Sequence, residues 1–242
     1  MKLRLIYTLL LTLAAALTAS AQMDFEKVPR VKPDIEKIKS EINNRGSRYY
    51  YPKLMEQFMR ADTAMNLDEF RHLYLGFALQ EDYNPYREPS FSNPVANLNS
   101  VNLTRQEADT VIHYANLALE DNPFDLQQMS VLISALRQRG QINLSKIWQY
   151  KFNYILMAIV STGTGADEEN AWYVIEPQHE YVLLNMMGLT VTNHVFYEPN
   201  DEGDSYYEYL TVVDGLGRRA GGYFFDIRLV LEEYYRKVPD AD

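Results

Sequence analysis

Residues 66–87, NLDEFRHLYLGFALQEDYNPYR, form the most strongly patterned stretch of this 242-residue chain. Asn66 is a good helix N-cap, and Glu69 follows three residues later, which is the spacing of a capping box. Apolar side chains then recur at the three- and four-residue spacing of one helical face, at Leu67, Phe70, Leu73, Tyr74 and Phe77. From Leu73 to Leu79 the segment is apolar on almost every side. The pattern predicts a helix that begins after Asn66 and is buried by the rest of the chain.

An aromatic turn follows this helix. Pro85 moves Asn84 out of the helical region, so we expect the chain to turn there. Two interpretations stay open. Tyr83, Asn84 and Tyr86 form a ligand or partner contact, or both rings pack over the helix end with their hydroxyls in water. At least one ring should lie near the surface, and we expect Tyr83 to be structural and Tyr86 to make the contact.

Glycines mark two places where the chain needs space. Gly76 lies inside the predicted helix, where it costs about 1 kcal/mol relative to alanine. We expect it to allow close approach of another backbone segment. Gly163 and Gly165 lie in a Thr-rich loop that resembles half of a phosphate-binding loop. The Lys-Ser/Thr that such a loop requires is missing, so we interpret these glycines as a structural hinge.

Three patches carry a resemblance to a known family. They are HLYLGFALQEDYNPY at 72–86, residues 161–188 with their Gly163/Gly165 loop, and YFFDI at 223–227. Together they resemble domain of unknown function 4919, a secreted family of Bacteroidetes. The resemblance spans most of the chain and implies export and an approximate fold. It implies no catalytic or binding residues.

The first residues are typical of a signal peptide. Lys2 and Arg4 precede an apolar run at 5–17, and Ala19-Ser20-Ala21 is an A-x-A cleavage site. The alternative, a membrane anchor, needs a longer apolar run. No cysteine follows the cleavage site, so the signal is not that of a lipoprotein. We therefore expect cleavage between Ala21 and Gln22, with the protein exported to the periplasm or the medium, and no membrane span in the mature chain.

Charge and cysteine content exclude several classes of function. Removal of Lys2 and Arg4 leaves 21 Lys and Arg against 33 Asp and Glu, a net charge of −12. This argues against nucleic acid as a partner, because binding to phosphates needs clustered cations. The chain has no cysteine. It therefore has no disulfide, no thiolate zinc site and no cysteine nucleophile.

Helical periodicity continues to residue 160. Thr104 and Glu107 form a second capping box, which opens a helix to about residue 121. Further helices are predicted at 124–139 and 144–160, and shorter ones near 33–45 and 52–59. The pair at 104–139 places Ala118, Pro123, Leu132 and Gly140 as a tetratricopeptide-type unit does, so we expect a tetratricopeptide-like helical hairpin.

The pattern changes after residue 161. Short alternating segments predict strands at 171–175, 189–197, 205–213 and 218–225, with helices at 179–187 and 226–237. The last two strands should pair as a hairpin, giving a small, mainly antiparallel sheet with two helices. The expected fold class is therefore α+β, with a signal peptide at 1–21, a helical region at 22–160 and an α+β region at 161–242 packed on it.

The sequence contains no recognisable catalytic or metal-binding motif. The acidic loop with Glu198, Asp201, Glu202 and Asp204 does not place ligands in the register of an EF-hand. The four histidines lack the H-E-x-x-H spacing, and no G-x-S-x-G elbow is present. We expect neither a metal nor a cofactor.

Two hypotheses about function remain. The first is a non-enzymatic binding or assembly module of the cell envelope, with an envelope protein as its partner. The second is an envelope hydrolase that uses acidic catalytic residues, since carboxylates that act together need not be close in sequence. A convergence of buried ionisable groups would favour the enzyme, and an exposed aromatic surface would favour binding.

The signal peptide generates a first prediction. Expression with the natural N-terminus in an export-competent host should yield a protein that begins at Gln22, because signal peptidase cleaves after A-x-A. Intact-mass spectrometry of the purified product measures this directly. A product that retains Met1, or that stays in membranes after a carbonate wash, would contradict it.

Overall fold

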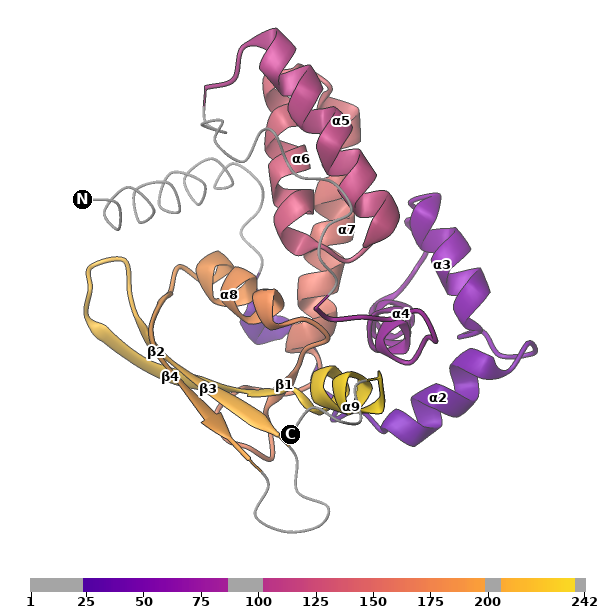
Figure 1. Ribbon diagram of the computed structural model, residues 1–242, viewed down its shortest axis with the longest axis vertical. Helices are drawn as coiled ribbons and strands as arrows, with labels where there is room; N and C mark the ends of the chain where they lie inside the picture. Colours follow the sequence, from indigo (N-terminus) through magenta and orange to yellow (C-terminus); the bar gives the residue numbers. More distant parts are fainter. Residues whose placement is uncertain (1–23, 87–101, 199–205, 238–242) are drawn as a thin grey trace. The chain divides into compact units, whose positions relative to one another are not determined.

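The structure is a computed structural model, and it describes residues 24–86, 102–198 and 206–237 (Figure 1). The expected signal peptide at 1–21 and most of the acidic loop, residues 199–205, lie outside these ranges. The chain groups into two compact units. Of the described residues, Asp24 and 102–153 belong to one unit, and 25–86 belong with 154–198 and 206–237 to the other. The boundaries expected from the sequence, with a helical region at 22–160 and an α+β region at 161–242 packed on it, stay a prediction.

The unit at 102–153 contains the helical hairpin. Helix α5 (Arg105–Asp121) and helix α6 (Leu126–Gln138) pack against each other, and helix α7 (Ile142–Val160) begins in this unit. The predicted capping box opens α5: the side chain of Thr104 accepts the amide of Glu107, and Glu107 accepts the amide of Thr104. Asp125 caps α6 with a single hydrogen bond, in which its side chain accepts the amide of Gln128. The predicted helical hairpin is confirmed.

Helix α4 (Leu67–Ala78) lies at the centre of the second unit. It contacts helix α2 (Ile35–Asn43), helix α3 (Tyr51–Met59) and helix α9 (Arg228–Lys237) (Figure 1). Its capping box forms as predicted, with Asn66 and Glu69 each accepting the other's backbone amide. Leu73, Tyr74 and Leu75 are fully buried. A short 3₁₀ turn, η1 (Phe25–Lys27), precedes these helices.

The same unit contains one four-stranded sheet. Strands β1 (Trp172–Tyr173), β2 (Thr190–Tyr197), β3 (Tyr207–Val213) and β4 (Arg219–Asp226) are ordered β1-β4-β3-β2. Strands β2, β3 and β4 pair antiparallel, and β1 pairs parallel to β4. Helix α8 (Pro177–Met186) packs against β2 (Figure 1). Helices followed by a small, mainly antiparallel sheet with two helices confirm the α+β class.

The strand register assigns side chains to the two faces of the sheet. Glu208 lies opposite Phe196 on β2 and Phe225 on β4, so these three share one face. Leu210 and Val212 follow on that face and are fully buried, so we call it the inner face. Tyr209 lies opposite Phe224 on the other, outer face, where both rings are half-buried. The inner face therefore supplies the core of the sheet.

The first strand is shorter than expected, two residues in place of 171–175. Side chains take the place of a strand partner at Ile175: its amide donates to the hydroxyl of Tyr74 at 3.2 Å, and its carbonyl accepts the hydroxyl of Tyr83. Pro177 then starts α8 at its first turn, where a missing N–H costs nothing. The helix therefore begins two residues before the predicted start.

The two sets of glycines have different roles. A Cβ at Gly76 would lie 3.3 Å from side-chain atoms of Ile42 and Tyr51, so the expected close approach of a backbone there is wrong. Gly76 makes room for side chains from α2 and α3. A Cβ at Gly163 would lie 2.2 Å from the carbonyl oxygen of Asn170, and the indole of Trp172 donates to the carbonyl of Gly163 at 3.0 Å. This tight packing supports the structural interpretation of the loop.

Candidate functional site

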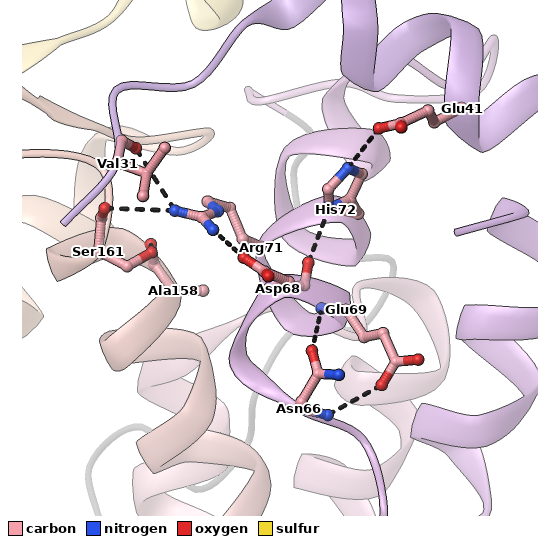
Figure 2. Close-up of polar contacts among 9 residues, drawn as sticks. All are labelled: Val31, Glu41, Asn66, Asp68, Glu69, Arg71, His72, Ala158 and Ser161. Atoms are coloured by element: carbon pink, nitrogen blue, oxygen red, sulfur yellow. Dashed lines mark hydrogen bonds and ion pairs between the residues drawn. The ribbon is translucent and has the colours of Figure 1, made fainter. Parts of the chain in front are cut away.

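A polar cluster on α4 holds three segments of the second unit together (Figure 2). One guanidinium nitrogen of Arg71 lies 3.4 Å from the carbonyl of Val31 and 3.5 Å from that of Ser161, and another pairs with Asp68. The amide of Val31 donates to the same Ser161 carbonyl at 2.7 Å. Arg71 therefore ties the segment before α2 to the residue after α7. Two of these contacts go to backbone carbonyls and the third goes to Asp68 on the same helix, which indicates a structural role.

His72 belongs to the same cluster (Figure 2). Its Nδ1 lies 2.7 Å from the carbonyl of Asp68, and its Nε2 lies 2.9 Å from a carboxylate oxygen of Glu41. Carbonyls and carboxylates only accept, so both contacts are hydrogen bonds when the ring carries two N–H groups. Tyr49 stacks on the ring with centroids 3.7 Å apart. Because the ring is covered and both nitrogens are engaged, His72 links α2 to α4.

A second polar cluster is enclosed between α4 and α8. The hydroxyl of Tyr74 lies 2.8 Å from Nδ1 of His179 and accepts the amide of Ile175. Nε2 of the same ring lies 3.5 Å from a carboxylate oxygen of Glu176. Burial raises the pKa of Tyr74 well above its usual 10. All three side chains are buried, so they act as an internal scaffold.

The acid pair is a different arrangement, and it consists of Glu180 on α8 and Glu208 on β3. Glu180 exposes 0% of its surface, and its carboxyl group interacts with that of Glu208. Burial raises its pKa well above 4.5, and the neighbouring Glu208 raises it further. The side chain of Glu208 keeps 15% of its surface exposed and lies 3.2 Å from Nε2 of His194. The pair therefore connects a buried carboxyl to the surface.

An aromatic belt borders the acid pair. Five rings from four segments follow one another, with centroids 5.3 to 6.5 Å apart: Tyr86, Tyr234, Tyr235, Tyr206 and Phe196. Phe196 is the register partner of Glu208. The pKa of Tyr86 is raised first by burial and then by Glu208, Tyr234, Tyr235 and Glu180. Tyr86, Tyr235 and Phe196 are exposed.

The residues singled out in the aromatic turn take different positions. Tyr83 is 1% exposed, packs edge-on to Phe77 and donates its hydroxyl to the carbonyl of Ile175. Asn84 accepts the amide of Tyr86 at 3.0 Å and so shapes the turn. Tyr86 is 49% exposed and enters the belt. The expectation that at least one ring lies near the surface is confirmed, and that ring is the one of Tyr86.

Sequence reasoning missed the acid pair and the other members of the belt. Glu180 and Glu208 are 28 positions apart and belong to elements whose pairing no local pattern predicts. Within the described ranges, no group of three or more His, Asp or Glu side chains is arranged to hold a metal ion. The acidic loop considered for calcium lies largely outside those ranges.

Residues 36–236 match the family described as domain of unknown function (DUF4919), and the chain belongs to that family. No curated protein and no solved structure matches the chain. Along the described parts of the chain, every helix is too short or too polar to cross a membrane.

The two tyrosines of the turn generate a prediction about stability. Tyr83→Ala should lower the free energy of unfolding by about 3–5 kcal/mol, because it leaves a cavity in the core. Tyr86→Ala should cost about 0.5 kcal/mol or less, because its ring is half in solvent. Urea titration of both variants compares the two costs. Equal destabilisation would show that the turn is core on both sides and would exclude Tyr86 as a contact.

Glu180 generates a prediction about pH. Its pKa is raised by folding, so the folded state holds a proton that the unfolded state releases above about 4.3. The stability from this group is complete below the unfolded pKa and is lost as the pH rises toward the folded pKa. Glu180→Gln, which cannot ionise, should therefore gain stability relative to the parent as the pH rises.

Urea titrations from about pH 5 to pH 8 measure this difference. Glu120→Gln removes the same charge at an exposed position on α5 and serves as the control. Parallel stability curves for the parent and Glu180→Gln would contradict the prediction.

Proposed function

We propose that this protein is an exported, non-enzymatic binding module of the cell envelope, which holds a partner protein at the aromatic belt. The signal-like N-terminus supports export. The resemblance to a secreted Bacteroidetes family supports the same compartment. The belt is the observation on which the binding role rests.

The composition of the belt suits protein recognition. Tyrosine is enriched at the centres of protein interfaces because it buries a large rigid surface at a small cost in side-chain entropy. Four of the five belt residues are tyrosines, and they come from the turn after α4, the start of β3 and α9. Their ring-to-ring contacts fix their orientation before a partner arrives. Preorganisation of this kind reduces the entropic cost of binding.

The acid pair also gives the hydrolase hypothesis a specific basis. A carboxyl whose pKa is raised by burial and by a neighbouring acid is the usual form of a general acid. A general acid must come within hydrogen-bond distance of its substrate, however, and Glu180 has no exposed surface. The exposed aromatic surface therefore favours binding over catalysis.

Site-specific photo-cross-linking tests the binding proposal. A benzophenone side chain is placed at position 86 or, as the control, at position 197. Tyr197 is similarly exposed but packs near Phe224 on the outer face of the sheet. In cells that export the protein, we expect a discrete cross-linked species from position 86 and none of comparable yield from position 197. Absence of a species specific to position 86 would contradict the proposal.

A further inference from the structure

The outer face of the sheet carries a second group of aromatic rings, which the proposed function does not use. Tyr209 on β3 and Phe224 on β4 lie opposite each other, with ring centroids 4.6 Å apart. The ring of Tyr197 on β2 lies 6.1 Å from that of Phe224 and is 40% exposed. Helix α8 packs on the inner side of the same sheet (Figure 1). We call these three rings, which lie on the side away from α8, the outer platform.

A glycine determines how one ring of the platform lies. A Cβ at Gly222 would lie 2.4 Å from both Cζ and the hydroxyl oxygen of Tyr209, so this ring occupies the space that a side chain on β4 would fill. Side chains on a strand usually stand perpendicular to the sheet. A ring that leans across the neighbouring strand instead turns one face to the backbone and the other face outward. Glycine weakens the interior of a strand and often marks a place where a ligand approaches closely.

Uncharged polar side chains border the platform. Asn193 on β2 lies opposite Thr211 on β3, and Thr211 lies opposite Gly222 on β4, so the three form one row across the sheet. Asn193 is exposed and Thr211 is half-buried. An amide both donates and accepts hydrogen bonds, and so does a hydroxyl. The row therefore places groups that can bind hydroxyls next to the ring of Tyr209.

The charged side chains of this face lie toward its two ends. Asp226 at the end of β4 is paired with Arg228 at 2.6 Å, so these two charges offset each other. Arg219 lies opposite Val213, near the turn of the β3–β4 hairpin. Binding of an anionic polymer needs clustered cations. The platform between these ends therefore suits a ligand without charge.

We propose that the outer platform binds a neutral oligosaccharide chain. A sugar ring has an apolar face of C–H groups, which packs on an aromatic ring, and a border of hydroxyls, which bond to amide and hydroxyl groups. The platform offers both kinds of contact side by side. Small ligands are usually bound in concave pockets, whereas rings spread over three strands suit an extended chain. The inference concerns the face opposite the aromatic belt and does not depend on the proposed function.

Titration of the purified full chain with sugars tests this inference. The probes are four neutral hexasaccharides, namely cellohexaose, xylohexaose, mannohexaose and maltohexaose, and one acidic probe of the same length, hexagalacturonic acid. NMR on protein with labelled tyrosine rings, assigned with Tyr→Phe variants, follows the binding. We expect at least one neutral probe to shift the signals of Tyr197 and Tyr209 and to leave Tyr86 unchanged. The acidic probe should bind more weakly than its neutral counterpart.

Matched variants then separate contact from folding. Tyr197→Ala should weaken sugar binding by about fivefold or more, whereas Tyr86→Ala, which removes a similarly exposed ring on the belt, should leave it unchanged. Asn193→Ala should weaken binding several-fold, because it removes hydrogen bonds to the sugar. Tyr209→Phe keeps the ring and should bind within about twofold of the parent. Urea titration of each variant shows that the loss is not one of folding.

Three results would overturn the proposal. The first is that none of the neutral probes shifts Tyr197 or Tyr209. The second is equal sugar affinity in the parent and Tyr197→Ala. The third is a discrete protein adduct from benzophenone at position 197, or a dimer of the chain that Tyr197→Ala abolishes, since either would assign the platform to a protein contact. Loss of the cross-link at position 86 would overturn the proposed function alone and leave the sugar site standing.

Discussion

The hydroxyl of Tyr74 is the contact on which the second unit depends. It joins α4 to the amide of Ile175 after β1 and to His179 on α8, so one buried group connects a helix to the chain segment between a strand and the next helix. Tyr83 completes the arrangement by donating to the carbonyl of the same Ile175. A buried backbone amide or carbonyl without a partner costs about 1–3 kcal/mol. Two tyrosines from the α4 region remove that cost and fix where α8 begins.

The start of α8 in turn positions the candidate site. Pro177 begins the helix, His179 points to Tyr74, and the next residue, Glu180, meets Glu208 on the inner face of the sheet. Adjacent residues on a helix point about 100° apart, so the orientation of one determines the other. The polar contact that anchors α8 therefore also directs a carboxyl into the interior. The scaffold and the acid pair are consequences of the same helix placement.

Local patterns in the sequence were sufficient to predict the helices, the strands and the α+β fold class. Both capping boxes, the helical hairpin, the change of period after residue 161 and the surface position of Tyr86 depend on short-range spacing, and the structure confirms each. The errors have one cause, which is that they depend on long-range packing. Gly76 makes room for side chains of α2 and α3, and Ile175 pairs with tyrosines from 92 and 101 positions away. Periodicity carries no information about either contact.

The sequence analysis missed the candidate site for the same reason. The energetic cost of this site indicates that it has a function. A buried carboxyl beside a second acid destabilises the fold unless it stays protonated, and an apolar side chain at position 180 would avoid that cost. Local departures from good packing rules are most common where a protein binds or reacts. Elsewhere in this chain, Asp226 and Glu69 each meet an arginine stacked on a tyrosine. Glu180 instead meets a second acid, Glu208, whose register partner Phe196 begins a row of partly exposed tyrosines.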